Sequence, residues 1–326
     1  MKILVVGAGF AGSVVARELA DHGHDITVID CRDHVAGNAY DEVNEAGIRV
    51  HRYGPHLFHT SNQRVIDWLS RFTKWTPYEH HILARLPDGS HVPFPPNLNT
   101  IERLGKKNIW PVLYEPYSRR MWAEHFDEIH GSVLDRVRVR ADRDNRAFRD
   151  SFQALPIDGY TAMFGRILDH GRITVRLNTW FNRAMEDDYD HVYNSMAIDE
   201  YYEYLYGELP YRSLRFHVRD EKEGLPCATV NFTTNCKYTR ATEWQKIPGH
   251  GINNHITTLT YEEPCDWKET GERHYPVITQ TTKDRYYHYK NIKNDRVTFI
   301  GRCGGYVYLD MHQVVSSTLS LLGLKN

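Results

Sequence analysis

The sequence lacks the cysteine pairs that would predict a zinc site or a framework of disulfides. Its five cysteines are widely spaced and no two of them form a CxxC pair, which favours free thiols in a reducing compartment. It also lacks an apolar run of about 20 residues, the length of a membrane span. The apolar N-terminal stretch contains three glycines and leads into a charged segment, so we expect neither a signal peptide nor an anchor. These absences predict a cytoplasmic protein.

An excess of charge of one sign is absent as well. Lys and Arg number 40 and Asp and Glu number 42, which gives a formal net charge of −2. The whole chain therefore has no general attraction for nucleic acid or for an anionic membrane. His56 and His59 stand three positions apart, but no further side chains complete a ligand set, so we expect no metal. An anionic ligand must be held by local cations.

The sequence is rich in tyrosine, with 21 residues, and this composition favours a polar site lined with aromatic rings. Its length of 326 residues is enough for two domains or one elaborated domain, because a single core usually stops growing near about 250–300 residues. We therefore expect a sizeable core.

A dinucleotide site is predicted at the N-terminus. Residues 3–6 form an uninterrupted apolar run, typical of a buried parallel strand, and Gly7, Gly9 and Gly12 follow as a GxGxxG motif. These glycines permit a tight turn, close approach of a pyrophosphate and close packing of a helix on the strand. Asp30 ends the next strand, where a carboxylate can bind an adenosine ribose. This acid favours FAD or NAD over NADP.

The segment after Asp30 favours FAD. Arg32, Gly37 and Asn38 follow within a few positions. They resemble the second phosphate-contacting loop of FAD-dependent proteins of the amine-oxidase type.

The rest of the chain predicts a helical region followed by antiparallel strands. A hairpin is expected with its turn at Asp88-Gly89, helices from about 100 to 135, and alternating strands from 211 to 277. A last strand, a glycine-rich turn and a closing helix end the chain. We expect Tyr306 and Tyr308 on one face of a strand and Val307 on the other.

An arginine-rich stretch runs from residue 136 to 149. Most of these arginines are expected to form a solvated charged surface. One or two of them could clamp a diphosphate, because the planar guanidinium fork matches phosphate oxygens.

Collinear motifs then identify a family. "GAGFAG", "GNAY", "GPHLFHT", "NLNT", "YSRRMW", "DGYTAM", "VNFT", "YTRATEW", "HYPV" and "YLDMHQV" resemble, in order and spacing, those of the flavin-dependent UDP-galactopyranose mutases, from residue 1 to the C-terminus. The resemblance implies an isomerase that interconverts the pyranose and furanose forms of a UDP-sugar. It also implies that reduced FAD acts as a nucleophile through N5 at the anomeric carbon while UDP leaves. NAD(P)H or a reduced flavin would be the reductant.

The resemblance implies an α/β fold of three parts. Residues 1–70, 153–210 and 290–326 would form a Rossmann-like FAD-binding domain. Residues 98–152 would form a small helical insertion with a mobile loop, and residues 71–97 and 211–289 an antiparallel β-sheet substrate domain.

The resemblance also assigns roles to individual residues. The expected catalytic residues are Arg140, Arg240, Arg302, Asp310 and His56. The expected substrate-binding residues are Asn97, Tyr117, Trp122, Phe152, Tyr275 and Tyr308. The expected cofactor-binding residues are Gly7, Gly9, Phe10, Ala11, Gly12, Asp30, Cys31, Gly37, Asn38, His56, Arg302, Asp310 and Met311.

Three departures from the family pattern leave parts of this interpretation open. The helical region is shortened before Tyr117, where the family forms its usual dimer contact, so the oligomeric state does not carry over. Phe152 stands where the family has a tyrosine, which removes one expected hydrogen bond to phosphate. Val307 and Leu309 replace an arginine and a tyrosine.

These departures leave alternatives to the main interpretation. The substrate could be another sugar nucleotide, such as UDP-arabinopyranose. The chain could instead be a flavin oxidoreductase of the amine-oxidase type, or a nucleotide-sugar binder without catalysis.

Overall fold

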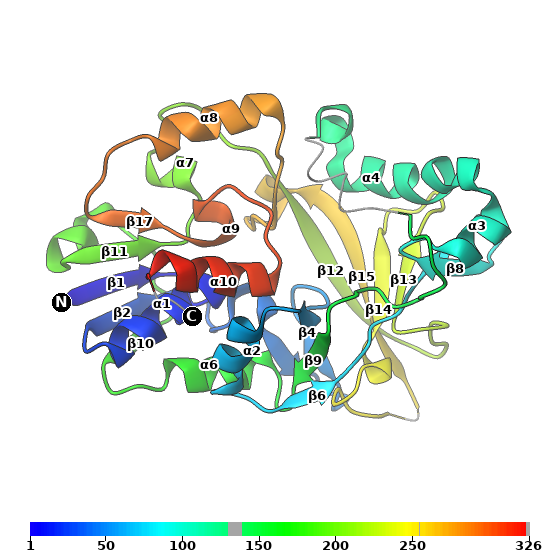
Figure 1. Cartoon of the computed structure of the whole chain (residues 1–326), viewed down its shortest axis with the longest axis horizontal. Coiled ribbons are helices and arrows are strands. Elements are labelled where there is room, and N and C mark those ends of the chain that lie inside the picture. The colour runs from blue at the N-terminus through cyan, green and yellow to red at the C-terminus, as the bar shows by residue number, and fades with distance from the viewer. Residues whose placement is uncertain (130–138, 254, 324–326) are drawn as a thin grey trace.

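The computed structural model describes residues 1–129, 139–253 and 255–323, and two large sheets organise it (Figure 1). The first is a five-stranded sheet in the order β10–β2–β1–β11–β17, in which all neighbouring strands are parallel. Its strands are β1 (Lys2–Val6), β2 (Asp25–Ile29), β10 (Ile173–Arg176), β11 (His191–Asn194) and β17 (Val297–Phe299). The predicted buried parallel strand at residues 3–6 is confirmed.

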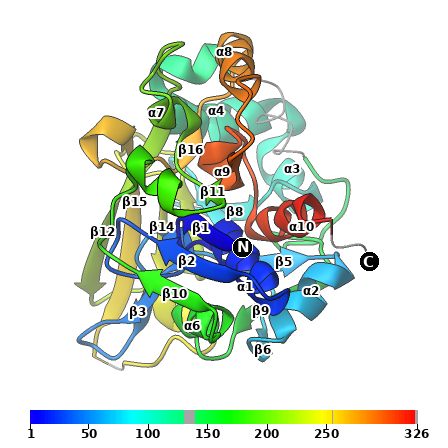
Figure 2. The same ribbon diagram turned by 90° about the vertical axis from the view of Figure 1, so that its left-hand side faces the viewer.

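Helices cover both faces of this sheet. Alternate side chains of β1 point to opposite faces and pack into a buried cluster on each. Ile3 and Val5 belong to a buried cluster with residues of α1, whereas Leu4 and Val6 belong to one that contains Tyr201 of α7. Figure 2 looks along the sheet and shows the helices on its two sides. They are α1 (Phe10–Asp21), α6 (Tyr160–Leu168), α7 (Ile198–Tyr201), α8 (Gln280–Lys290) and α10 (Met311–Leu321).

The second sheet has seven strands in the order β16–β12–β15–β14–β13–β7–β8. Its strands are β7 (Ile82–Arg85), β8 (His91–Phe94), β12 (Tyr211–Glu221), β13 (Thr229–Phe232), β14 (Arg240–Glu243), β15 (Thr257–Asp266) and β16 (Tyr275–Pro276). The hairpin predicted at Asp88-Gly89 joins β7 to β8, and Gly89 has the positive φ of 83° that its turn requires. The predicted antiparallel pairing holds except between β13 and β7, which are parallel.

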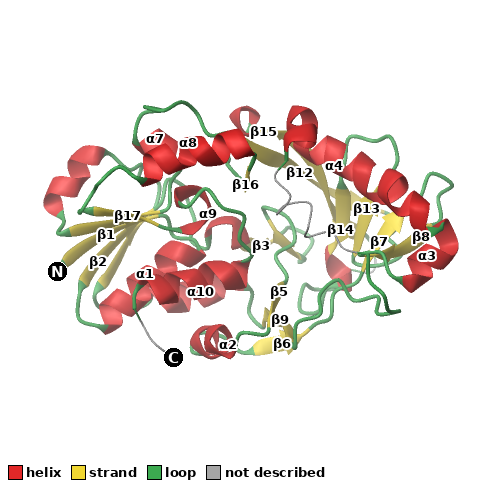
Figure 3. Cartoon of the chain, turned by 45° about the horizontal axis from the view of Figure 1, so that its top comes forward, coloured by secondary structure: helices red, strands yellow, loops and turns green. Residues whose placement is uncertain are grey.

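A helical layer covers the β7–β8 end of the second sheet (Figures 1 and 3). It contains α3 (Leu98–Leu104), the short helices η2 (Lys106–Asn108), η3 (Trp110–Tyr114) and η4 (Ala123–Glu128), and α4 (Glu115–Trp122). The predicted helical region is confirmed as far as residue 129. The last part of that region and the start of the arginine-rich stretch lie outside the described residues.

Smaller elements connect the two sheets. They are the strand pair β3 (Asp41–Val43) and β4 (Arg49–His51), and the three-stranded sheet of β5 (Phe58–Thr60), β9 (Phe152–Pro156) and β6 (Trp75–Pro77). Helix α2 (Gln63–Ser70) and the single turns η1 (Gly37–Ala39), η5 (Arg183–Asp188), η6 (Trp244–Lys246) and η7 (Trp267–Glu269) complete the fold. In the described part of the chain, no helix has the length and apolar character needed to cross a membrane.

The C-terminal segment corrects one prediction. After β17 the chain forms α9 (Gly301–Gly304), and residues 305–310 form no strand before α10 begins. Tyr306 has a positive φ of 41° and its hydroxyl donates to the carbonyl of Val277 at 2.6 Å, inside a buried cluster. Tyr308 stacks on Tyr275 instead. Tyr306 and Tyr308 therefore do not share the face of a strand, because no strand forms here and the two rings pack in different surroundings.

Candidate functional site

The glycine turn between β1 and α1 is so tightly packed that Gly7 and Gly12 have no room for a side chain. A Cβ atom on Gly12 would lie 1.9 Å from the carbonyl oxygen of Gly7, and Gly7 itself has a φ of 100°. A Cβ atom on Gly37 would lie 2.9 Å from the Cα atom of Gly9. The turn and η1 therefore approach backbone to backbone, as the close passage of a pyrophosphate requires.

The residues after β2 surround this turn. Asp30 accepts hydrogen bonds from the amides of Ala8 at 2.7 Å and Arg32 at 2.9 Å, so its carboxylate faces the glycine turn. Arg32 donates to the Asn38 side chain at 3.0 Å and pairs with Glu272. Cys31, between them, is an exposed free thiol. The structure thus brings the predicted cofactor residues of both loops together.

Three further predicted cofactor residues lie where α1, α9 and α10 meet. A Cβ atom on Gly301, which begins α9, would lie 3.1 Å from that of Ala11. Phe10 packs edge-on against Phe164 with ring centroids 4.8 Å apart, and Met311 packs against the same core. Helix α9, which carries Arg302, is in this way placed directly against the glycine turn.

A buried ion pair lies on the second sheet. Arg240 of β14 pairs with Glu262 of β15, with Nε and Oε2 3.2 Å apart. Its Nη2 donates to the Tyr117 hydroxyl of α4 at 3.3 Å. Burial opposes the charge of Arg240, but Glu262, Tyr117 and Tyr275 together outweigh this effect, and the pKa of the guanidinium rises. The site therefore holds a permanent cation between sheet and helix.

A second cation lies among the predicted tyrosines. Tyr275 and Tyr308 stack with centroids 5.6 Å apart, and the Arg302 guanidinium lies 5.6 and 5.3 Å from the two rings. Arg302 donates to the carbonyls of His274 at 3.0 Å and Leu309 at 2.6 Å. Burial raises the pKa of Tyr275, so its hydroxyl stays protonated and can donate to an anion.

His56 lies in the field of both arginines. Burial lowers its pKa to about 4, with further lowering by Arg302 and Arg240. Its Nδ1 lies 2.9 Å from the carbonyl of Gly54, and its amide donates to His51 at 3.0 Å. A neutral His56 with Nδ1–H donating fits these contacts. A neutral His56 thus lies near both arginines without adding charge.

Asp310 lies at the start of α10, and Trp122 lies at the end of α4. Asp310 immediately precedes α10, and its amide donates to the Gln313 side chain at 2.8 Å in a capping box. Trp122 is buried with Leu214 and Val277 in the cluster against which Tyr117 and Tyr275 pack. Trp122 thus belongs to the core beneath the tyrosines.

The structure does not bring three predicted site residues into this cluster. Arg140 donates to the carbonyls of Arg146 and Ala147 in its own loop. Asn97 is fully buried as the N-cap of α3, and its amide donates to the Asn145 side chain at 2.6 Å. Phe152 packs edge-on against Phe58 and Trp75, with centroids 6.2 and 5.3 Å away.

Two residues of the cluster were missed by the sequence reasoning. His274 is buried, burial lowers its pKa to about 3, and its Nε2 lies buried without a partner among the described residues. The sequence feature that could have identified His274 as a site residue is its position next to Tyr275 in the motif "HYPV". Glu262 carries no local signal, because only the register between β14 and β15 places it opposite Arg240.

The fold and this cluster define a Rossmann-type dinucleotide-binding protein whose second sheet carries cations and tyrosines. The model of the UDP-galactopyranose mutase family matches residues 112–308, and that of a NAD(P)-binding Rossmann-like domain matches residues 5–72. The chain belongs to the UDP-galactopyranose mutase family, whose members are isomerases.

Individual relatives agree over almost the full length. A probable UDP-galactopyranose mutase of Klebsiella pneumoniae is 30% identical over 98% of this chain and 93% of its own. A dTDP-fucopyranose mutase of Escherichia coli is also 30% identical, over 98% of this chain and 96% of its own. The crystal structure of a reduced UDP-galactopyranose mutase covers 100% of this chain and 96% of its own with a TM-score of 0.76 at 16% identity. The structural likeness shows that the fold is shared.

Proposed function

We propose that this protein interconverts UDP-galactopyranose and UDP-galactofuranose with FAD as its cofactor. The observation that carries the proposal is a set of two arginines with tyrosine partners: Arg240 of β14 with Tyr117 of α4, and Arg302 of α9 with Tyr275 and Tyr308. Family membership supports the activity, and the local cations supply what the net charge of the chain does not.

The residues of the first sheet fit a flavin dinucleotide. Gly12 allows α1 to pack closely on the turn, since a Cβ atom there would meet the Gly7 carbonyl at 1.9 Å, and Gly9 would let a pyrophosphate approach the backbone. The Asp30 carboxylate, held at the end of β2, would bind the adenosine ribose. When bound and reduced, the flavin supplies the nucleophile that takes the anomeric carbon of the sugar. NAD(P)H or a reduced flavin would keep it reduced.

The chain itself would stabilise the leaving diphosphate. Arg240 is fixed by Glu262 and Tyr117 before substrate binds, so its orientation needs no reorganisation during the reaction. The protonated hydroxyl of Tyr275 can donate to a phosphate oxygen beside it. Arg302 donates hydrogen bonds to the backbone carbonyls of His274 and Leu309. These bonds would keep its positive charge beside the stacked rings of Tyr275 and Tyr308.

Arg140 would join the diphosphate only after a rotation. Its guanidinium now binds the carbonyls of its own loop, and burial lowers its pKa, with like charges nearby acting in the same direction. We propose that the loop around Arg140 closes when a diphosphate offers stronger acceptors than those carbonyls. We further propose that residues 1–70, 153–210 and 290–326 act as the FAD-binding domain.

The decisive experiment is an activity assay with reduced protein. The purified FAD-loaded chain is reduced with dithionite, given UDP-galactopyranose, and the nucleotide sugars are separated by chromatography. We expect UDP-galactofuranose from the reduced protein alone. Turnover by the oxidised protein, or none by the reduced protein with UDP-galactopyranose, would contradict the proposal.

The same assay tests the substrate. UDP-arabinopyranose is included because the family pattern changes at Val307 and Leu309. A dTDP-hexopyranose is included because a dTDP-fucopyranose mutase is as similar as a UDP-galactopyranose mutase. The proposed assignment requires the highest kcat/KM for UDP-galactopyranose.

A further inference from the structure

His274 is a buried residue with a ring nitrogen that none of the interactions above explains. It immediately precedes β16, and its Nε2 makes no hydrogen bond within the described part of the chain. The residue is 4% exposed, and Arg302 of α9 donates to its backbone carbonyl at 3.0 Å. Buried polar atoms in folded proteins are nearly always paired, so this nitrogen requires an explanation.

The contacts of the other ring nitrogen decide which of the two carries the proton. The amide of Leu214 on β12 donates to Nδ1 at 3.3 Å, and the Ser213 hydroxyl lies 3.1 Å from the same atom. Strand β16 pairs with Tyr211 and Arg212, so Nδ1 supplies an acceptor to β12 just beyond that pairing. A backbone amide can only donate, so Nδ1 carries no proton. Burial lowers the pKa of the ring to about 3, so it is neutral and its one N–H is at Nε2.

Aromatic rings surround this N–H group. The rings of Tyr53, Phe216 and Tyr275 lie 6.1, 5.8 and 6.2 Å from that of His274, centroid to centroid. The Tyr53 hydroxyl lies 2.8 Å from Nε2 of His34 and is already engaged there. An N–H contact with the ring of Phe216 would be weaker than a hydrogen bond to oxygen or nitrogen. Within the residues that the structure describes, Nε2–H thus has no conventional acceptor.

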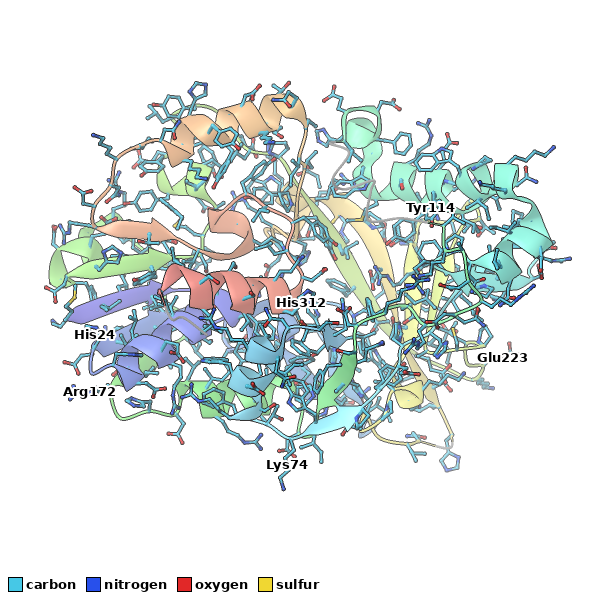
Figure 4. All side chains as sticks on the ribbon, viewed as in Figure 1. His24, Lys74, Tyr114, Arg172, Glu223 and His312 are labelled. Carbon is cyan, nitrogen blue, oxygen red and sulfur yellow. The ribbon has the colours of Figure 1, made fainter. Side chains whose placement is uncertain are left out.

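His274 lies between two groups of residues that face the expected cofactor. On one side is Tyr53, with the guanidinium of Arg32 4.4 Å from its ring, and Arg32 belongs to the loop beside the glycine turn. On the other side is Arg302, whose helix α9 begins against α1. Strand β16 lies between α9 and β12 (Figure 3), and side chains fill this region (Figure 4). A dinucleotide that extends from the glycine turn toward Arg302 would pass this ring.

The charges around His274 belong to the same groups. Arg32, Arg302 and His56 all lower the pKa of its ring, so all three lie within electrostatic range of it. The next residue, Tyr275, stacks on Tyr308 in the cluster that we assign to the diphosphate. His274 instead contacts Tyr53, in the loop that carries His56. These surroundings favour the cofactor over the sugar nucleotide as the source of the acceptor.

We propose that His274 donates its Nε2–H to the bound FAD and is a cofactor-binding residue of this protein. The proposal rests on the function proposed above, which assigns FAD to this chain. FAD offers acceptors of two kinds, the nitrogens and oxygens of the flavin ring system and the oxygens of its ribityl and pyrophosphate chain. Either kind would give the buried N–H group the partner that it lacks.

Two substitutions separate the donor of His274 from its acceptor. Glutamine places an amide N–H near the position of Nε2, and asparagine places an amide oxygen near that of Nδ1. His274→Gln therefore keeps a donor toward the cofactor and loses the acceptor of the Leu214 amide, whereas His274→Asn does the reverse. We expect His274→Asn to weaken FAD binding by about tenfold and His274→Gln to bind FAD nearly as the wild type does.

Equilibrium release of FAD from the diluted holoenzyme, followed by flavin fluorescence, measures this affinity. His191→Asn is the control, since this half-buried histidine begins β11, at the edge of the sheet opposite the glycine turn. It should bind FAD as the wild type does. If His274→Asn does not fold, His274→Phe, which keeps a ring and removes both polar atoms, replaces it and should show the same loss relative to His274→Gln.

The flavin spectrum and midpoint potential of His274→Asn identify the acceptor. A change in both would place it on the ring system, and a loss of affinity without such a change would place it on the ribityl or pyrophosphate chain. A loss in His274→Gln as large as that in His274→Asn would overturn the proposal, because His274 would then only support Leu214. Unchanged FAD affinity in the folded variants would overturn it too, as would a loss of affinity for UDP alone. A wild-type chain that binds no FAD would overturn the proposed function as well.

Discussion

Arg240 and Glu262 lie opposite each other on β14 and β15, with Nε and Oε2 3.2 Å apart, and Glu262 is 2% exposed as a residue. Burial raises the pKa of Glu262 and the neighbouring guanidinium acts against that rise. Each charge therefore depends on the other, and Tyr117 holds the guanidinium from the helix side. The proposed phosphate-binding cation is positioned by the sheet register itself.

Arg240→Lys should lower kcat/KM for UDP-galactopyranose by about 100-fold, the scale of removing one preorganised donor in the transition state. A lysine keeps the charge but has no planar fork that could bind Glu262, Tyr117 and a phosphate together. Steady-state kinetics of the reduced enzyme would measure the loss. Arg215→Lys, at an exposed pair with Glu269, is the control and should retain wild-type kinetics. Full activity of the Arg240 variant would show that Arg240 does not bind the phosphate.

Glu262→Gln should lower the free energy of unfolding by about 3 kcal/mol, because it leaves a buried guanidinium without a counter-charge. Urea unfolding followed by circular dichroism would measure it. The adjacent Glu263→Gln provides a control, since its partners Lys237, Arg215 and His217 are 56%, 41% and 30% exposed and each such exposed pair contributes less than about 1 kcal/mol. Equal effects of the two substitutions would show that Glu262 does not support Arg240.

Gly12→Ala should prevent stable flavin binding, because its methyl group would lie 1.9 Å from the Gly7 carbonyl oxygen and displace the turn. The ratio of flavin absorbance to protein concentration after purification would report the loss. Gly165→Ala is the matched control, since that exposed glycine in α6 has no atom within 4 Å of the added methyl group. It should keep its flavin and gain up to about 1 kcal/mol of stability from the helical alanine.

The buried histidines predict a loss of stability in acid. Burial lowers the pKa of His80 and His274 to about 3 and that of His250 to about 4, below the unfolded value of about 6.5. The unfolded chain therefore binds protons first, so stability is retained above about pH 6.5 and falls as the pH drops toward 3. Each histidine should cost about 2 kcal/mol at pH 5.

Urea midpoints at pH 7.5, 6 and 5 would measure this dependence. In His274→Gln the loss of stability between pH 7.5 and 5 should be smaller by the contribution of one histidine. A midpoint that does not move between pH 7.5 and 5 would contradict the burial of these rings.

Phe152→Tyr should leave the affinity for UDP unchanged. The family pattern suggests that the tyrosine hydroxyl would reach a phosphate, which would strengthen binding by about tenfold or more. Phe152 instead packs edge-on against the rings of Phe58 and Trp75. Calorimetric titration of both proteins with UDP would decide. An increase in affinity in the variant would mean that this ring reaches the site in the bound state.

The N-terminal unit was predictable because its determinants are local. The apolar strand, the three glycines and Asp30 lie within one βαβ segment, and each has a requirement that only a few residue types meet. The hairpin at Asp88-Gly89 was predictable for the same reason. In both places the chain contacts residues that are near in sequence.

The errors occur where the fold depends on distant segments. The alternation expected for Tyr306 and Tyr308 assumed a strand, but α9 ends at Gly304 and the turn at Tyr306 buries that ring against Val277. Glu262 shows no pattern in the sequence, since only the pairing of β14 with β15 sets it opposite Arg240. Pairing between strands decides such positions, and it is not encoded in local periodicity.

The parallel pair of β7 and β13 has a consequence for how the chain acquires its structure during synthesis. Arg85 pairs with Phe232, 147 positions later, and the strand order places β13 between the β7–β8 hairpin and the rest of the sheet. At a translation rate of about 5–20 residues per second, the hairpin emerges about 7–30 s before its neighbour. Its outer edge, including Pro93 in β8, cannot pair as readily as a regular edge, so only the β7 edge is open to pairing with another chain until β13 arrives.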